Sequence, residues 1–195
     1  MNILVAQLIY GNRPHNILID NELKAGYPAI YCSINTEGIA NALNEGIDYM
    51  LENSFDAIAF LSNDIIEPQD WLAKKVDAMQ TYPSAGIIST SVETICSQII
   101  SQVIIGNYLI SHNTIKKIGY LNESMFPYGP IDIDYCHRCD AAGIKTYYLL
   151  DAMAQHIGSH ASGNEYGWDK EKLVNEGWDK VYKSGNYYKS KKNAI

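Results

Sequence analysis

The sequence lacks an apolar run long enough to cross a lipid bilayer, and it lacks an excess of basic residues. Its 15 Lys and Arg residues are outnumbered by 22 Asp and Glu, which gives a formal net charge of -7. A surface that binds nucleic acid neutralises phosphates with Lys and Arg, so this balance argues against that class of protein. The N-terminal stretch, MNILVAQLIYG, has neither the basic start nor the small-residue cleavage site of a signal peptide. We therefore expect a cytoplasmic protein that does not bind nucleic acid.

The sequence also has few cysteines, and no repeat or linker divides it. Four cysteines without an export signal are typical of reduced thiols and not of a disulfide framework. With 47% hydrophobic and 19% charged residues over a length of 195, the composition suits one folded domain with its own core. We expect residues 1–182 to form this domain. Residues 183–195, a basic stretch rich in Tyr and Lys, are expected to form a mobile tail.

Strand-like and helix-like patterns alternate along the chain. Apolar runs of strand length occur at residues 3–10, 29–35, 55–64, 85–90, 106–110 and 145–150. Helical patterns occur at residues 13–26, 36–53, 67–83, 113–117 and 130–143. The clearest of them places apolar residues on one face at Ile39, Leu43, Ile47 and Met50. This order predicts an α/β fold with a mainly parallel central sheet flanked by helices.

The carboxyl ends of the first three predicted strands are candidate ligand contacts. In open α/β sheets, ligands bind just beyond these ends. The polar residues found there are Tyr10 and Asn12, Ser33 and Asn35, and Ser62, Asn63 and Asp64. Asp64 is the acidic member of this set, and a carboxylate in such a place holds a divalent cation through oxygen.

Two cysteines and two histidines in the second half suggest a zinc site by their spacing. Cys136 and Cys139 are followed, after a gap of sixteen residues, by His156 and then His160. A zinc finger needs four ligands at one tetrahedral centre, usually with about twelve residues between the pairs. Here the cysteines lie in a helical pattern, and an apolar strand separates them from the histidines. We favour buried core cysteines and keep a zinc-binding module as the least favoured alternative.

Two further acidic residues lie at the start of a predicted helix. Asp132 follows Gly129 and Pro130, a position where aspartate commonly caps a helix N-terminus. Asp134 lies four residues before Arg138, a spacing that favours an ion pair on the helix surface. Taken alone, these residues favour a helix cap and an ion pair.

Two longer stretches share their order and spacing with the motifs of one enzyme family. ALNEGIDYMLENSFDAIAFLSND contains an Asn-x-Gly turn at Asn44 and Gly46, followed by the strand that leads to Asp64. IKKIGYLNESMFPYGPIDIDYCHRCDAAG matches the family's later block at Gly119, Glu123, Asp132, Asp134, Arg138 and Gly143. With His156 as a late histidine, residues 1–163 resemble the family 2 glycosyltransferases, which have the GT-A fold.

The resemblance implies a single GT-A-like (Rossmann-like) domain that transfers a sugar, with inversion, from a nucleotide-diphosphate donor to an acceptor hydroxyl. It implies Asp64 as a ligand of Mn²⁺ or Mg²⁺, His156 as a second ligand or a diphosphate contact, and Asp132 as the general base. The residues implied to contact the nucleotide sugar are Tyr10, Asn12, Ser33, Asn35, Asn44, Ser62 and Asn63. Those implied on the acceptor side are Tyr128, Gly129 and Asp134. The acceptor itself stays open (glycan, lipid-linked or protein), and the Tyr-rich C-terminal third suits a homo-oligomer contact.

The sequence departs from the family pattern at several positions. Ser62 stands where the family often has the first acid of an Asp-x-Asp motif, and Ile131 stands where Glu usually precedes the base. Ser33 and Asn35 occupy the region that usually offers an aspartate to the nucleotide base. These differences keep a second class of function open, a non-catalytic nucleotide- or sugar-binding module with the same fold.

Overall fold

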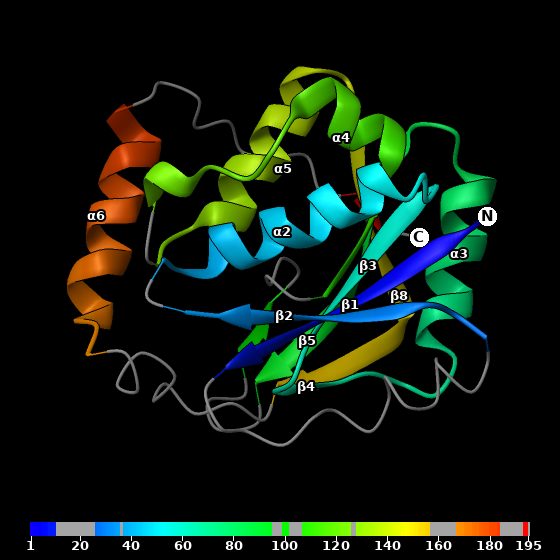
Figure 1. Cartoon of the computed structure of the whole chain (residues 1–195), viewed down its shortest axis with the longest axis horizontal. Helices are drawn as coiled ribbons and strands as arrows, with labels where there is room; N and C mark the ends of the chain where they lie inside the picture. Colours follow the sequence, from blue (N-terminus) through cyan, green and yellow to red (C-terminus); the bar gives the residue numbers. More distant parts are fainter. Residues whose placement is uncertain are drawn as a thin grey trace.

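The computed structural model describes residues 1–10, 26–35, 37–94, 99–101, 107–125, 128–156, 167–183 and 193–194. Within this part of the chain, nine strands form one sheet with helices on both faces (Figure 1). The strands are β1 (Ile3–Tyr10), β2 (Ala29–Ile34), β3 (Ala57–Ser62), β4 (Ile65–Ile66), β5 (Ala85–Thr94), β6 (Ile99–Ser101), β7 (Tyr108–Ser111), β8 (Lys145–His156) and β9 (Asn193–Ala194). The helices are α2 (Ile39–Glu52), α3 (Trp71–Thr81), α4 (His112–Ile118), α5 (Ile131–Ala141), α6 (Lys170–Lys183) and the 3₁₀ helix η1 (Glu123–Met125).

The strand order confirms the predicted α/β fold with a central sheet between helices. The strands run in the order β2-β1-β3-β7-β5-β8-β4, with β6 beside β5 and β9 beside β8. β1 is parallel to β2 and β3, and β5 is parallel to β8. β7 is antiparallel to both β3 and β5, so the sheet is mixed at its centre. The helix predicted over residues 13–26 falls almost wholly outside the described residues, as does most of the predicted tail.

Two apolar layers hold the helices to the sheet. Successive side chains of a strand point to opposite faces, so β1 contributes to both layers. Leu4 and Leu8 pack in the layer beneath α2, α4 and α5, whereas Ile3 and Val5 pack in the layer beneath α3. All six residues of β3 are buried, as expected of a strand covered on both faces. The turn that follows β3 therefore begins at a strand whose side chains are packed on both faces.

Helix α2 lies close to the sheet because of Gly46. The predicted apolar face of this helix is confirmed, since Ile39, Leu43, Ile47 and Met50 are all buried. A Cβ atom on Gly46 would lie 3.1 Å from Phe60 Cε1 and 3.2 Å from Cys32 Sγ. Such distances are shorter than ordinary van der Waals contact, so glycine permits the close approach of helix and sheet.

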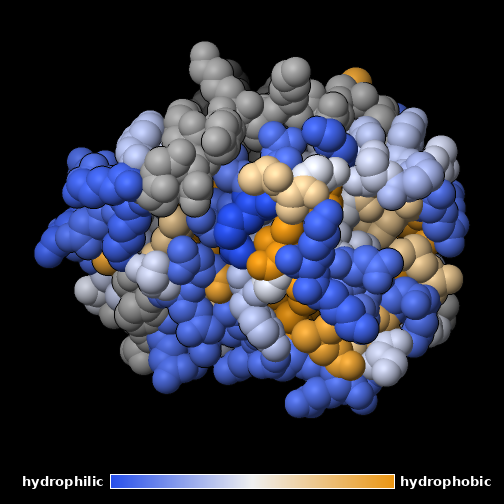
Figure 2. All heavy atoms as spheres, turned by 90° about the horizontal axis from the view of Figure 1, so that it is seen from above, coloured by the Kyte–Doolittle hydropathy of each residue, from blue (hydrophilic) through white to orange (hydrophobic). Residues whose placement is uncertain are grey.

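The second half of the chain completes the sheet and adds α6, a helix that we did not predict. β8 extends six residues beyond the predicted strand, and its register with β5 shifts between Thr90 and Ser91. Among the described residues, no helix combines the length and the apolar character that crossing a membrane requires. Viewed from the side of α4 and α5, the surface is mostly hydrophilic with small apolar areas between (Figure 2).

Candidate functional site

The carboxyl ends of β1, β2 and β3 lie side by side, because all three strands run in parallel. Tyr10 ends β1 and Ser62 ends β3. Ser33 and Asn35, at the end of β2, are exposed. Asn12 lies outside the described residues. The structure thus brings four of the predicted nucleotide-contact positions to one edge of the sheet.

Two buried amides near this edge retain hydrogen-bonding capacity. Asn63 is 8% exposed and Gln7 is 0% exposed, and neither amide group of the two has a hydrogen-bond partner among the described residues. Gln7 of β1 lies opposite Leu61 of β3, and Asn63 follows in the turn after β3, where its backbone N–H donates to Leu8 O at 3.0 Å. Gln7 was not predicted as a site residue, although a polar residue inside an apolar strand could have indicated it. Unsatisfied buried amides are unfavourable, which makes this pair available to a ligand or water.

Asp64 lies in the turn after β3, with its carboxylate largely buried. The residue is 7% exposed. Ser62 Oγ donates a hydrogen bond to Asp64 Oδ1 at 2.5 Å. His156 Nε2 lies 3.3 Å from Asp64 Oδ2. The hydroxyl therefore engages one carboxylate oxygen and the imidazole approaches the other.

The pairing of β4 with β8 brings Asp64 and His156 together from distant parts of the chain. The two strands are antiparallel, with Ile65 opposite His156 and Ile66 opposite Gln155. Because Ile65 directly follows Asp64, the same pairing places the carboxylate beside the imidazole. Strand β4 is only two residues long, so no sequence pattern predicted this contact.

Asp132 lies half-buried in the first turn of α5. The cap interpretation is wrong, because Pro130 is the N-cap residue and no side chain caps the helix. Asp132 Oδ1 instead accepts the backbone N–H of Ile133 at 2.9 Å. Burial raises the pKa of Asp132 from 3.8 to about 7, and hydrogen bonds to the carboxylate offset part of this effect. A carboxyl group that titrates near pH 7 is suited to general-base catalysis.

Tyr128 links Asp132 to Asp64. Burial raises the pKa of Tyr128 to about 12, and the charges of Asp132 and Asp64 both contribute to the rise. The two carboxylates therefore lie near one phenol, although one follows β3 and the other belongs to α5. Tyr108 of β7 and Tyr148 of β8 also lie within reach of the Asp132 charge. Burial raises the pKa of each tyrosine, and the charge of Asp132 raises it further. Neither tyrosine was predicted as a site residue.

Asp134, which the resemblance places on the acceptor side, forms an ion pair. Arg138 Nε donates to Asp134 Oδ2 at 2.9 Å, which confirms the predicted pair. Arg138 also donates to the backbone oxygens of Ile118 at 3.2 Å and Tyr120 at 3.0 Å. Asp134 thus helps to tie α5 to the segment after α4, and we assign it a structural role.

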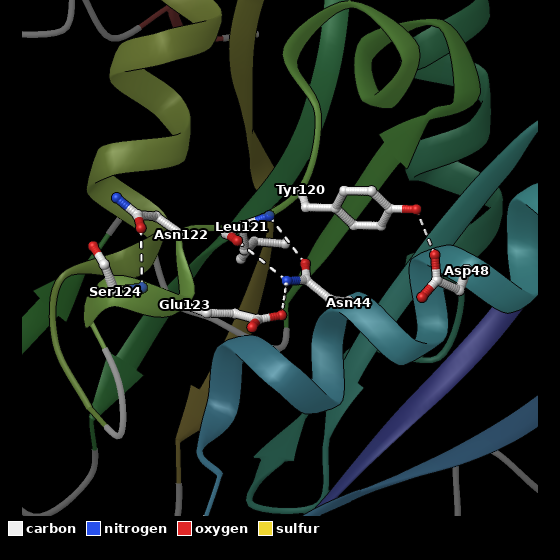
Figure 3. A pocket seen from close by; sticks show the side chains of 7 residues that line it. All are labelled: Asn44, Asp48, Tyr120, Leu121, Asn122, Glu123 and Ser124. Carbon is white, nitrogen blue, oxygen red and sulfur yellow. Dashed lines mark hydrogen bonds between the residues drawn. The ribbon is translucent and has the colours of Figure 1, made fainter.

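The resemblance places Asn44 beside the nucleotide sugar. In the structure, its side chain forms hydrogen bonds with the segment that follows α4 (Figure 3). Its Nδ2 donates to the backbone oxygen of Leu121 at 3.1 Å and to Glu123 Oε1 at 2.8 Å. The backbone N–H of Leu121 donates back to Asn44 Oδ1 at 3.0 Å. Both ends of the amide are therefore engaged with the segment that follows α4. These bonds give Asn44 a structural role, and its contact with the nucleotide sugar stays a prediction.

Asn44 also lines a hollow of about 580 Å³ between α2 and residues 120–124 (Figure 3). Polar groups around this hollow bond to one another. Tyr120 Oη donates to Asp48 Oδ1 at 2.5 Å, and Asn122 Oδ1 accepts the backbone N–H of Ser124 at 3.0 Å. The hollow shares no lining residue with the site around Asp64 and Asp132.

The cysteines of the suggested zinc site lie in the core. Cys136 and Cys139 are free and buried, and both belong to the apolar layer beneath α2. Burial raises the pKa of Cys139 to about 12, and that of Cys136 rises further above its ordinary value. Both are therefore neutral thiols, whereas zinc binds thiolates. The interpretation as core cysteines is confirmed; His160 lies outside the described residues.

Asp64 and His156 form the pair that fits a divalent cation. Carboxylate oxygen and imidazole nitrogen are both ligands that Mn²⁺ accepts. No cluster of three or more His, Cys, Asp and Glu side chains occurs in the part of the chain that the structure describes. A cation held here would therefore need ligands from water or from a bound diphosphate. Because Ser62 stands where the family pattern often has an acid, Asp64 is the one carboxylate that this pair would offer to a cation.

A buried polar network, which we did not predict, anchors the chain just after Asp64. Lys75 Nζ of α3 donates to Glu67 Oε1 and to Asn107 Oδ1, both at 2.6 Å. Thr90 Oγ1 of β5 donates to Glu67 Oε2 at 3.1 Å. Lys75 is 0% exposed and Glu67 3% exposed. Because Glu67 follows Asp64 by three residues, the network fixes the loop that carries Asp64.

Comparison with known proteins identifies the fold. No family model and no curated protein matches the sequence. The catalytic domain of Drosophila beta1,4galactosyltransferase 7, solved with xylobiose, matches with a TM-score of 0.63 and 14% identity over 91% of this chain and 81% of that chain. The mannosyltransferase PcManGT from Pyrobaculum calidifontis, solved with GDP-Man and Mn²⁺, matches with a TM-score of 0.61 and 12% identity over 84% of this chain and 59% of that chain. The chain has the GT-A fold.

The GT-A fold is also matched by a structure of similar length. A197 from STIV has a TM-score of 0.61 and 18% identity, over 82% of this chain and 87% of that chain. At these identities the similarity shows the fold, and the activity has to be argued from the site.

Proposed function

We propose that this protein is an inverting, divalent-metal-dependent glycosyltransferase that moves a sugar from a nucleotide-diphosphate donor to an acceptor hydroxyl. The observations that support the proposal are the contact of His156 with Asp64 and the charges of Asp132 and Asp64, both of which add to the raised pKa of Tyr128. The fold supports the proposal, because solved transferases with this fold include complexes with GDP-Man and Mn²⁺ and with UDP and Mn²⁺.

Asp64 and His156 are the residues that would hold the cation, Mn²⁺ or Mg²⁺. When bound, such a cation neutralises the diphosphate and stabilises the charge that develops on the leaving group. The buried Lys75–Glu67 ion pair keeps the loop of Asp64 in one conformation, so these ligands are positioned before the donor arrives. Tyr10, Ser33, Asn35 and Asn63 lie at the edge where the nucleotide would bind.

Asp132 is the proposed base. As the acceptor oxygen attacks the anomeric carbon, its proton passes to the Asp132 carboxylate. A bond from that carbon to the acceptor oxygen forms, and the bond to the diphosphate oxygen breaks. A single displacement of this kind inverts the anomeric centre. The pKa of about 7 leaves a substantial fraction of Asp132 ionised at neutral pH while keeping it basic enough to accept the proton.

One observation favours the second candidate, a binding module without turnover. Ser62 uses its hydroxyl to occupy Asp64 Oδ1, at the position where the family pattern has an additional acid. A site with one carboxylate and one imidazole would bind a nucleotide with less help from a cation. Such a module would still be stabilised by nucleotides, but it would not consume them.

A turnover assay tests the proposal against this alternative. UDP-, GDP- and dTDP-sugars are incubated with the protein and Mn²⁺, and the released nucleoside diphosphate is measured; the same mixtures are examined by thermal shift. We expect one donor class both to raise the melting temperature and to be consumed. Stabilisation by a donor without release, under Mn²⁺ or Mg²⁺ and with a panel of sugar acceptors, would support the binding module instead.

A further inference from the structure

Helix α6 packs against the turn that leads into Asp132. Gly177 of α6 is buried. A Cβ atom on Gly177 would lie 2.6 Å from Pro130 Cδ and 3.0 Å from Gly129 Cα. The first distance is shorter than real Cβ atoms show, and both partners belong to a ring or to the backbone, which cannot turn aside. Glycine at position 177 is therefore required for this approach.

Further contacts hold α6 against the same segment. Lys180 Nζ donates to the backbone oxygen of Ser124 at 2.5 Å, one turn further along the helix. Val181 is 2% exposed and belongs to the core layer that includes Ile131, and Trp178 packs against that layer. Figure 1 shows α6 at the edge of the molecule, beside η1 and the start of α5. The helix is thus fixed both to the loop and to the core.

The turn under α6 carries the residues of the proposed chemistry. Tyr128 directly precedes Gly129, and Asp132 follows Pro130 by two residues. The backbone N–H of Ile131 donates to Gly129 O at 2.9 Å, so the turn determines where α5 begins. A shift of the turn would therefore move both the Tyr128 phenol and the Asp132 carboxylate relative to Asp64.

We propose that Gly177 is a positioning residue, through which α6 holds the turn at Gly129 and Pro130 and thereby keeps Asp132 opposite Asp64. Its catalytic consequence rests on the proposed transferase function. Gly177 touches no reacting atom. Its effect on the reaction comes from geometry, since a displacement of about 1 Å costs on the order of a hundredfold in rate.

The test is Gly177→Ala in the 195-residue chain. Alanine forms helices better than glycine, by roughly 1 kcal/mol, so the substitution does not weaken α6 itself. The new methyl group has to displace either the helix or the turn. We expect kcat to fall about 10- to 100-fold, while the KM for the donor and the affinity for Mn²⁺ stay within about twofold.

A pH profile distinguishes mispositioning from general loss of stability. The groups that face Asp132 are Tyr108, Tyr128, Tyr148 and Cys136, all of which burial keeps neutral near pH 7. At saturating Mn²⁺, with the proposed ligands Asp64 and His156 occupied, the acidic limb of the kcat profile therefore reports on Asp132. We expect Gly177→Ala to move this limb to lower pH, because a displaced turn admits water to the carboxyl group.

Gly46→Ala is the matched control. Its Cβ atom would meet Phe60 at 3.1 Å, but at the interface of α2 with the sheet. We expect a loss of stability with kcat and the acidic limb unchanged. In the other direction, Pro130→Ala removes the ring atom that a methyl group at position 177 would strike. The 3.0 Å approach to Gly129 Cα remains, so adding Gly177→Ala to Pro130→Ala should cost less in kcat than Gly177→Ala costs in the native protein.

Amide hydrogen exchange separates this inference from the proposed function. We expect Gly177→Ala to speed exchange of the Ile131 and Asp134 N–H groups at least tenfold, and Gly46→Ala to leave it unchanged. If the native protein consumes no donor but exchange changes in this way, the positioning role stands and the transferase proposal fails. Unchanged exchange at both amides, or an active Gly177→Ala protein with native kcat and pH profile, would overturn the inference.

Discussion

At the scale of single residues, the carboxyl group of Asp132 combines a chemical advantage with a cost in stability. Burial raises its pKa from 3.8 to about 7, so the folded state binds this proton more tightly than the unfolded state does. The stability that depends on this group is therefore fully present below about pH 4. It falls as the pH rises towards 7, by at most roughly 4 kcal/mol, because the folded protein then has to hold a buried charge.

Asp132→Asn should separate the two effects. The amide oxygen still accepts the Ile133 N–H, but no charge is buried and no proton can be taken from an acceptor. We expect turnover to fall at least a thousandfold while the donor still binds. We also expect a melting temperature about 3–10 °C above that of the native protein at pH 8, and little difference at pH 4. A melting temperature equal to or below native at pH 8 would contradict the raised pKa.

Asp64 and His156 allow a direct test of the proposed cation site. The affinity for Mn²⁺ in the presence of GDP or UDP is measured by calorimetry for Asp64→Asn, His156→Ala and, as a control, Asn175→Ala at an exposed position of α6. We expect Asp64→Asn to weaken Mn²⁺ binding at least tenfold, because it removes the charged ligand, and His156→Ala to weaken it less. Equal Mn²⁺ affinity in all three variants would place the cation elsewhere.

Single residues also show which features of the site can be predicted from the sequence and which cannot. Asp64 and Asp132 stand out because each is an acid at the end of an apolar strand or the start of a helix. Asn44 belongs to the same family pattern, but its hydrogen bonds hold the loop at Leu121. Tyr108 gives no local signal, since its place beside Asp132 arises only when β7 packs against α5. The chemical type of a side chain can be read from the sequence, whereas its hydrogen-bond and packing partners depend on tertiary contacts.

At the scale of helices and strands, Asn44 connects α2 to the segment after α4. Removing its amide leaves the buried backbone N–H and C=O of Leu121 without these partners, at a cost of about 1–3 kcal/mol each. Asn44→Ala should therefore lower the melting temperature by roughly 5–12 °C, with the donor KM unchanged. The exposed residue Asn175 of α6 provides the control substitution to Ala, which we expect to be neutral. A raised donor KM at an unchanged melting temperature would support the predicted ligand contact.

The ion pair of Lys75 with Glu67 connects α3 to the loop of Asp64. Lys75→Met leaves a buried carboxylate unpaired and should destabilise the protein by about 3–5 kcal/mol in chemical denaturation. Lys75→Met combined with Glu67→Leu removes both charges and should recover most of this loss. A double variant as unstable as the single variant would show that the network, and not charge pairing, supplies the stability.

Element prediction succeeded where an apolar pattern was long and failed where it was short or interrupted. Strands β1, β3 and β5 were predicted because each is a continuous apolar run, and α2 because its apolar stripe covers several turns. Strand β4 has two residues and exists through its pairing with β8. Helix α6 does have a stripe, at Leu173, Val174, Trp178 and Val181, but Gly177 interrupts it where the helix meets Gly129. Lys75 likewise lies within the apolar stripe of α3, where a charge is not expected.

At the scale of the whole molecule, the fold was predictable and the site was only partly so. The order of strands and helices determines the layers, and the rule that ligands bind beyond strand ends led to the prediction of a site at the carboxyl ends of β1, β2 and β3. The contact between Asp64 and His156, and the placement of Asp132 by α6, depend on residues that are far apart in the sequence. Asp64 follows β3, whereas Asp132 belongs to α5, so any shared site for these two acids depends on tertiary packing.

In the proposed reaction, Asp132 removes a proton from an acceptor at a site where Asp64 would hold a cation. The most direct measurement is release of nucleoside diphosphate from the stabilising sugar donor, with and without Mn²⁺, by the native protein and by Asp132→Asn. We predict release by the native protein that requires the cation, and binding without release by Asp132→Asn. Release by Asp132→Asn at the native rate, or equal release by the native protein in the presence of excess EDTA, would contradict the account.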